Sequence, residues 1–180
     1  MRKLITATFM IIIGANLTSC SKDSHSESTS HTIGQSYGGG IIFYLDSTGN
    51  HGLIAATSDL SVVYWGSGTI ITNATATVLG TGQANTNAII AAQGVGSYSA
   101  SLCDQLVLNG MSDWYLPSKD ELSYMFNQKA LIGGFNALPS VYWSSSETST
   151  NSAWIQNFYN GAQASYGKFT PFSTRPIRSF

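Results

Sequence analysis

The chain has 180 residues, of which 9% are charged, and its formal net charge at pH 7 is -1. Soluble proteins average about 25% charged residues, and a protein that binds nucleic acid needs a basic surplus to neutralise phosphates. The composition therefore argues against a nucleic-acid partner, while 43% hydrophobic and 12% aromatic residues indicate a chain that folds around a core rather than a disordered one.

The first 19 residues have the pattern of an export signal. Arg2 and Lys3 form a positive start, and residues 4–15 form an apolar run that is too short for a stable membrane span. Residues 17–20, LTSC, resemble the lipobox of bacterial lipoproteins, in which the cysteine becomes the lipid-bearing N-terminus. We therefore expect a mature chain that begins at Cys20 and is held by its acyl chains in the bilayer of the bacterial outer membrane, exposed at the cell surface or facing the periplasm. An ordinary secretory signal with an incidental cysteine is the alternative.

A polar stretch separates this signal from the folded domain. Residues 20–32 are rich in serine and have no large apolar side chain, so we expect a flexible tether. His25 and His31 lie in the tether, and we expect both to be solvated rather than to bind a metal. The domain itself, residues 33–180, has a single cysteine, Cys103, in an apolar helical pattern. We expect it to be buried as a small hydrophobic residue, with no intrachain disulfide.

In the first half of the domain, apolar runs and turn-forming residues predict one hairpin and two helices. The expected elements are a β-hairpin at 41–45 and 53–57, an extended segment at 62–66, a loop at 70–82, a helix that begins at Asn85 or Thr86, and a second helix at 98–108.

The clearest local signal is DWYLPSKDELSYMF. Ser118 followed three residues later by Glu121 is a capping box, which predicts a helix over residues 119–129. Asp120 and Glu121 could indicate catalysis or a metal, but the first turn of a helix favours acidic side chains, so we interpret both as structural.

From residue 141 onward the sequence alternates with the period of a strand. VYWSSSE, AWIQNFY, AQASYGKF and RPIRSF are expected to form an antiparallel ending, and Asn160-Gly161 is the strongest hairpin signal in the chain. Arg175 and Arg178 are expected to pair with carboxylates and tie the chain end to the core. The aromatic residues expected in the core are Trp143, Trp154 and Phe180. The fold class is therefore α+β, with helices followed by a terminal sheet.

Several segments together resemble bacterial domains of the DUF1566 or Lcl C-terminal type. The segments are GGGIIFYLDSTGNHGLIAATSDLS, GTGQANTNAIIAAQG, SDWYLPSKDEL, YWSSSE, AWIQNFYNG and RPIRSF, and the similarity covers residues 33–180. That family is associated with a C-type-lectin-like fold, related to the formylglycine-generating enzymes and to the variable proteins of diversity-generating retroelements. The resemblance implies a single α+β domain whose C-terminal sheet presents a ligand face.

The chain departs from these relatives where their chemistry resides. The Glu-Pro-Asn, Gln-Pro-Asp and Trp-Asn-Asp triplets of animal C-type lectins are absent, so we expect no metal and no cofactor. The formylglycine-generating enzymes work through a cysteine pair, which this domain lacks. Asp46, Ser47 and His51 share one hairpin loop, but no oxyanion motif accompanies them. We therefore expect a protein that is not an enzyme; an enzyme with an unrecognised site and a purely structural envelope protein are the alternatives.

The C-terminal hairpin is the candidate binding surface, with an adhesive or recognition role toward a protein or glycan ligand. Alternate residues of a strand face opposite ways, so Trp154 and Phe158 are expected to face the scaffold and Ile155 the ligand. Alanine at Ile155 should then leave the domain folded, whereas alanine at Trp154 should unfold it. Rings beside hydroxyls and small side chains are typical of binding loops, and retroelement-diversified relatives vary such positions. The candidate ligand-binding residues are Ile155, Asn157, Tyr159, Ala162, Ala164, Ser165, Tyr166, Phe169, Thr170, Phe172 and Ser173. An ordinary edge of the fold is the alternative.

Overall fold

The computed structural model describes residues 30–66, 69–138 and 140–180. The signal sequence, the lipidation site Cys20 and His25 lie outside the described residues, so what the sequence predicts for them stays a prediction. In the described ranges, none of the helices has the length and apolar character that crossing a bilayer requires.

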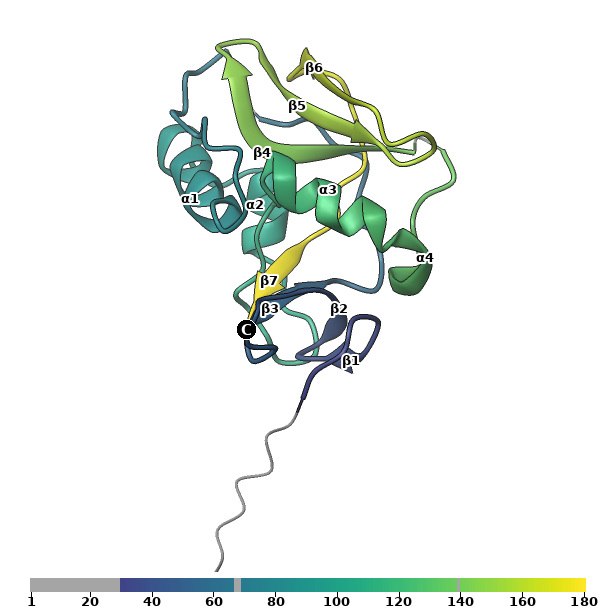
Figure 1. Ribbon diagram of the computed structural model, residues 1–180. Coiled ribbons are helices and arrows are strands. Elements are labelled where there is room, and N and C mark those ends of the chain that lie inside the picture. Colours follow the sequence, from purple (N-terminus) through teal and green to yellow (C-terminus); the bar gives the residue numbers. More distant parts are fainter. Residues whose placement is uncertain (1–29, 67–68, 139) are drawn as a thin grey trace, which may run out of the picture.

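The domain contains two antiparallel sheets, which confirms the α+β class. Figure 1 shows the sheets at opposite ends of the molecule, with the helices between them. The first sheet has the order β1-β2-β3-β7 and the second has the order β4-β5-β6. The strands are β1 Ser36–Tyr37, β2 Gly40–Leu45, β3 Gly52–Ala55, β4 Val141–Ser149, β5 Ser152–Asn157, β6 Gln163–Gly167 and β7 Ile177–Ser179. The helices are α1 Gly82–Gln93, α2 Ser99–Asp104, α3 Lys119–Asn127 and α4 Lys129–Ile132.

Both predicted hairpins form, but the last strand does not continue the terminal sheet. β2 and β3 pair with Ile42 opposite Ile54, and β5 pairs with β6 across a loop of residues 158–162. β7 instead returns to the first sheet and pairs with β3. The prediction of one continuous sheet ending is therefore wrong, because RPIRSF finds its hydrogen-bond partner more than a hundred residues earlier in the chain.

The two arginines before and within β7 explain how the chain end is held. Arg175 is buried, and its Nε donates to Asp59 Oδ1 at 2.5 Å. Arg178 makes a two-point contact with Asp113, with Nε to Oδ1 at 2.6 Å and Nη2 to Oδ2 at 2.8 Å. The Arg178 hydrogen bond holds the pKa of the Asp113 carboxyl below its usual value. The expected pairing of both arginines with carboxylates is confirmed.

The first two helices differ from the prediction at their ends. α1 begins at Gly82, so Asn85 and Thr86 lie inside the helix and are buried instead of capping it. Asn85 Nδ2 donates to the Ala76 carbonyl at 2.6 Å. α2 ends at Asp104 rather than near residue 108, because the chain then turns. Cys103 is fully buried as predicted, and burial raises the pKa of its thiol.

The predicted capping box at the start of α3 is confirmed. The Ser118 backbone N–H donates to Glu121 Oε2 at 2.7 Å, and the Glu121 N–H donates to Ser118 Oγ at 3.3 Å. The other carboxylate oxygen of Glu121 accepts from the Gly80 N–H at 2.9 Å. Burial raises the pKa of Glu121, whose carboxyl is used entirely to join the helix start to the preceding loop.

The N-terminal end of the domain includes a residue that the sequence assigned to the tether. His31 is half-buried, and its ring centroid lies 4.3 Å from that of Tyr37 and 5.0 Å from that of Phe180. The expectation that His31 is solvated is therefore wrong. Phe180 and Trp154 are half-buried rather than fully in the core, whereas Trp143 is completely buried. The chain enters beside β1, at the end of the molecule opposite the β4-β5-β6 sheet (Figure 1).

Candidate binding surface

The predicted ligand-binding residues differ in exposure. Exposed are Tyr159, Ala162, Ala164, Ser165, Tyr166 and Phe169; half-buried are Asn157, Thr170 and Phe172; buried are Ile155 and Ser173. A ligand cannot reach a buried side chain on a folded surface, so the structure removes Ile155 and Ser173 from the candidate surface.

The two faces of β5 were assigned wrongly for Ile155, which was expected to face a ligand. Ile155 is 6% exposed and packs in the core cluster that contains Trp65 and Trp143. Trp154 lies on the opposite face, where the Lys119 ammonium stands 4.9 Å from its ring centroid. β5 is the middle strand of its sheet, and α3 covers one face while the Trp65 cluster covers the other. Alternate residues of β5 therefore point to two covered faces, and neither face is left open for a ligand.

Among the partly exposed residues here, two pairs of rings lie close together. We call Tyr64, Tyr166, Phe169 and Phe172 the aromatic surface. The ring centroids of Tyr166 and Phe172 are 5.2 Å apart, and those of Tyr64 and Phe169 are 6.3 Å apart. Tyr64, Tyr166 and Phe169 are each about half exposed, at 48%, 49% and 54%. A hollow of about 260 Å³ adjoins the rings, lined by Val62, Val63, Tyr64, Ser97 and Pro171.

Tyr64 was not foreseen as part of this surface. Its segment runs antiparallel to the chain after β6: the Val63 N–H donates to the Phe172 carbonyl at 3.0 Å, and the Trp65 N–H donates to the Lys168 carbonyl at 3.0 Å. Tyr64 consequently faces outward while Trp65 is fully buried. The alternation within VVYWG was the signal that could have placed Tyr64 on the surface, but not beside Phe169.

A buried ion pair fixes the turn that carries the aromatic surface. Lys168 lies between Gly167 at the end of β6 and Phe169, yet its side chain is fully buried and pairs with the Glu147 carboxylate. The Lys168 ammonium also donates to the Ile70 and Thr150 carbonyls at 3.0 and 2.9 Å, and lies 4.5 Å from the Trp65 ring centroid. Three separate chain segments are thereby joined at one cation.

Glu147 completes the same arrangement from β4. Its carboxylate accepts the backbone N–H groups of Thr72 and Asn73, at 3.1 Å each for Oε2. Asn73 has a positive φ of 59°, a conformation that these contacts hold in place. In the described residues, no group of three His, Cys, Asp or Glu side chains could hold a metal ion. The positive charge that the Ile70 and Thr150 carbonyls and the Glu147 carboxylate contact is the Lys168 ammonium.

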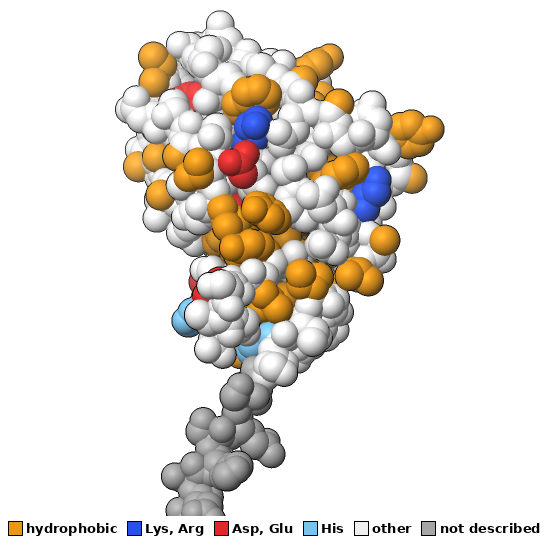
Figure 2. Space-filling model, in the orientation of Figure 1, with side chains coloured by type: hydrophobic (Ala, Val, Ile, Leu, Met, Phe, Trp, Pro, Cys, Tyr) orange, Lys and Arg blue, Asp and Glu red, His pale blue; other side chains and the backbone are white. Residues whose placement is uncertain are grey.

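The aromatic surface is free of exposed charge. Residues 148–174 contain one charged residue, Lys168, and it is buried. The charged residues on either side, Glu147 and Arg175, are buried as well. Figure 2 shows few acidic or basic side chains on the visible face of the whole domain. Contacts made here would rest on ring packing and neutral hydrogen bonds rather than on charge.

The hairpin loop with Asp46, Ser47 and His51, which we considered as a possible catalytic site, forms a hydrogen-bonded turn. Asp46 Oδ1 accepts from the Thr48 N–H at 3.0 Å, the Thr48 hydroxyl at 2.7 Å and the Gly49 N–H at 2.9 Å. The Thr48 hydroxyl is the main cause of a lowered pKa at Asp46. No hydrogen bond between side chains within the described residues joins Asp46 to His51 or Ser47.

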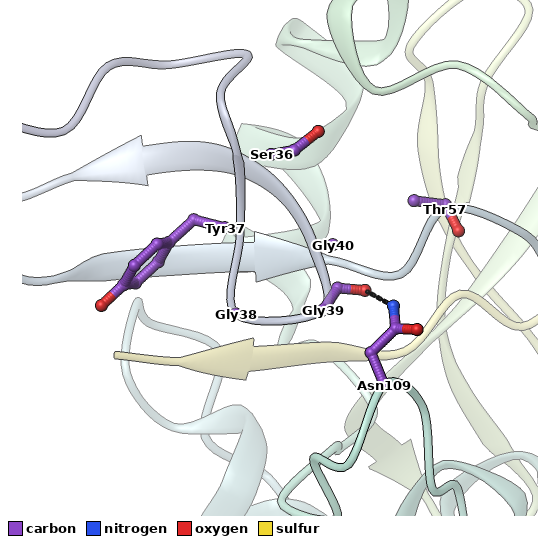
Figure 3. Close-up of a pocket in the computed structure, with 7 residues that line it drawn as sticks. All are labelled: Ser36, Tyr37, Gly38, Gly39, Gly40, Thr57 and Asn109. Carbon is purple, nitrogen blue, oxygen red and sulfur yellow. Dashed lines mark hydrogen bonds between the residues drawn. The ribbon is translucent and has the colours of Figure 1, made fainter.

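A second hollow, of about 340 Å³, lies at the glycine-rich turn between β1 and β2 (Figure 3). Asn109 Nδ2 donates to the Gly39 carbonyl there at 3.3 Å, and the Tyr37 ring points away from Asn109. The glycines are required by the fold itself: a Cβ on Gly38 would lie 2.6 Å from Arg178, and one on Gly40 would lie 2.1 Å from the Ala55 carbonyl. The glycine run is thus explained without a ligand.

Comparison with known families agrees with the sequence resemblance. The sequence profile of the Lcl C-terminal domain matches residues 72–178, which is more than half of the chain. The chain belongs to the Lcl C-terminal domain family. No curated protein was found to match it. The Lcl C-terminal domain match begins at the loop that Glu147 holds and includes Tyr166, Phe169 and Phe172 of the aromatic surface, whereas Tyr64 and the β2-β3 hairpin lie before it.

Proposed function

We propose that this Lcl C-terminal domain is the ligand-binding part of a bacterial lipoprotein and that the aromatic surface holds the ligand. The observation that carries the proposal is two pairs of partly exposed rings, three of which lie in a segment, residues 148–174, that exposes no charge. Several exposed rings close together are typical of recognition surfaces, and tyrosine gives a large contact area at a small entropic cost. Rings of this kind suit the binding of a ligand, and we propose no catalytic step for them.

The proposed fold is C-type-lectin-like. Two features support it: the first and last strands belong to one sheet, as its two edges, and a second, smaller sheet lies at the far end of the molecule. In this arrangement the first sheet holds the chain ends together. The second sheet, with the segment after it, is free to present side chains.

The chemistry of the surface favours an uncharged ligand epitope on a glycan or a protein. Rings stack on the apolar faces of sugars or pack against aliphatic side chains, and the phenol groups of Tyr64 and Tyr166 can make neutral hydrogen bonds. Four of the five residues of β6 are exposed, so we expect them to tolerate substitution, which is what diversification by a retroelement would require.

The proposed anchor places this surface away from the membrane. Residues 20–30 can span about 35 Å when extended, at about 3.5 Å per residue. The tether enters beside β1, and the β4-β5-β6 sheet lies at the opposite end of the domain (Figure 1). A lipid on Cys20 would therefore hold the domain with its aromatic surface outward.

The first test concerns the aromatic surface. Tyr166→Ala combined with Phe169→Ala is expected to weaken binding at least tenfold on arrays of glycans and cell-surface proteins, because truncating two central rings of an interface costs about 2 kcal/mol or more. Binding by the unchanged protein should vary little between low and high salt, since no exposed charge takes part.

Tyr159→Ala is the matched control. Tyr159 is 86% exposed but lies in the loop at the other end of the β5-β6 hairpin, so binding should persist. Equal losses from both variants would show that the aromatic surface is not the site. If no array ligand binds the unchanged protein saturably, the role as a structural envelope protein gains support instead.

The second test concerns the anchor. Cys20→Ser removes the only group that the lipobox interpretation allows to carry lipid, so the chain is expected to move from the membrane fraction to the soluble fraction. Fractionation of cells and immunoblotting measure this directly, with Cys103→Ser as a control that leaves the thiol of the proposed anchor unchanged. A Cys20→Ser protein that stays in the membrane fraction would refute lipid anchoring.

A further inference from the structure

The sheets of the domain protect most of their edges. A strand at an edge leaves a row of backbone N–H and C=O groups that another strand can pair with. The outer edge of β4 is covered, because the Ser145 N–H donates to the Pro117 carbonyl at 2.7 Å and the Glu147 N–H donates to the Ala74 carbonyl at 2.8 Å.

The first sheet offers no long free edge either. β7 is covered by Tyr115, which exchanges two backbone hydrogen bonds with Ile177, at 2.8 and 3.0 Å. The other edge strand, β1, has only two residues. Short or covered edges of this kind resist pairing with a further strand.

β6 is the exception. It pairs with β5 alone, and four of its five residues are exposed. Within the described residues, positions 163–166 make no backbone hydrogen bond outside the β5-β6 ladder. The strand sequence, QASYG, contains none of the charges or prolines with which proteins usually guard an edge. β6 is therefore an unguarded edge of a sheet.

We propose that β6 pairs antiparallel with β6 of a second copy of this chain, about a two-fold axis at Ser165, to form a six-stranded sheet. This register places Ser165 opposite Ser165 of the second copy, Ala164 opposite Tyr166 and Gln163 opposite Gly167. Each large side chain then faces a small one, which is the condition for close packing across antiparallel strands. An isologous contact of this kind closes with two copies and leaves no further β6 edge.

The charges of the chain do not oppose this pairing. The net charge is -1, and residues 148–174 expose no charge, so the two β6 strands themselves bring no like charges together. Tyr166 points to the same face of the joined sheet in both copies, because the two-fold axis is perpendicular to that sheet. The pairing thus places two aromatic surfaces on one side, although it needs no ligand to form.

The test uses two copies of the full chain with different affinity tags, expressed together and extracted in mild detergent. The unchanged copies should co-purify. Ser165→Lys in both copies is expected to lower co-purification about fivefold or more, because like charges directly opposite each other destabilise a strand pair. Ser165 is exposed and its hydroxyl contacts only Thr148 among the described side chains, so the variant should fold.

Pairing one Ser165→Lys copy with one Ser165→Glu copy should restore co-purification, which a misfolded variant could not do. Asn127→Lys, on the exposed side of α3, adds the same charge away from the edge and should change nothing. The proposal is overturned if unchanged copies do not co-purify, if Ser165→Lys pairs as well as the unchanged chain, or if the opposite charges fail to restore pairing.

Discussion

Replacing Lys168 with methionine is expected to lower the free energy of unfolding by about 3–5 kcal/mol, because the Glu147 carboxylate then stays buried without its partner. The ammonium also holds the Ile70 and Thr150 carbonyls, so its removal leaves two further acceptors unsatisfied. Urea unfolding followed by tryptophan fluorescence measures the loss, since the Trp65 ring lies beside the ammonium.

Lys119→Met is the matched control for this change. The Lys119 ammonium is partly exposed and lies 3.7 Å from the Asp120 carboxylate, an exposed arrangement that contributes about 1 kcal/mol or less. Combining Lys168→Met with Glu147→Gln should recover part of the stability, because the remaining buried group is then neutral. Similar losses for Lys168→Met and Lys119→Met would contradict the structural role of the buried pair.

Ile155→Ala is expected to destabilise the domain by about 2–5 kcal/mol, which is the range for truncating a buried aliphatic side chain to alanine. Ile155 fills the cluster between the second sheet and the segment around Trp65, and a cavity there cannot be filled by solvent. This is the opposite of what strand alternation alone predicts for the residue.

Tyr166→Ala provides the comparison on the next strand. The Tyr166 side chain is about half exposed, so its removal should cost about 1 kcal/mol or less. Denaturant unfolding of both variants, with the slope of the transition checked for two-state behaviour, measures the difference. A stable Ile155→Ala protein would mean that this side chain faces solvent after all.

The elements that the sequence predicted well depend on neighbours in the chain. The capping box needs only Ser118 and Glu121 three residues apart, and the hairpin around Gly161 needs only a turn between two alternating runs. The physical chemistry of these elements is local, so the residues that carry it are visible together. Even so, the β5-β6 loop spans residues 158–162 instead of two residues, and a Cβ on Gly161 would lie 2.8 Å from the Phe126 ring.

The features that escaped prediction depend on partners far along the chain. The faces of β5 could not be assigned because α3 covers one and residues near Trp65 cover the other, so both carry large side chains. Lys168 sits between two exposed rings and gives no local sign that it is buried; its partner Glu147 lies 21 residues earlier. Tyr64 joins the aromatic surface because its neighbours Val63 and Trp65 pair with Phe172 and Lys168, more than a hundred residues later.

If the proposed anchor and the proposed ligand surface are right, the position of β1 has a mechanical consequence, because the domain would be held at its N-terminus and would bind at its far end. Tension would then run from the tether, through the first sheet, to the aromatic surface. β1 is joined to β2 by two residue pairs, and a pull on the chain before it opens them one at a time. If this joint opened, residues 30–39 would add up to about 35 Å of extended chain to the tether, at about 3.5 Å per residue. The buried Lys168 and the rings beside it lie beyond this joint. A ligand held at the aromatic surface would therefore stay bound when β1 separates from β2.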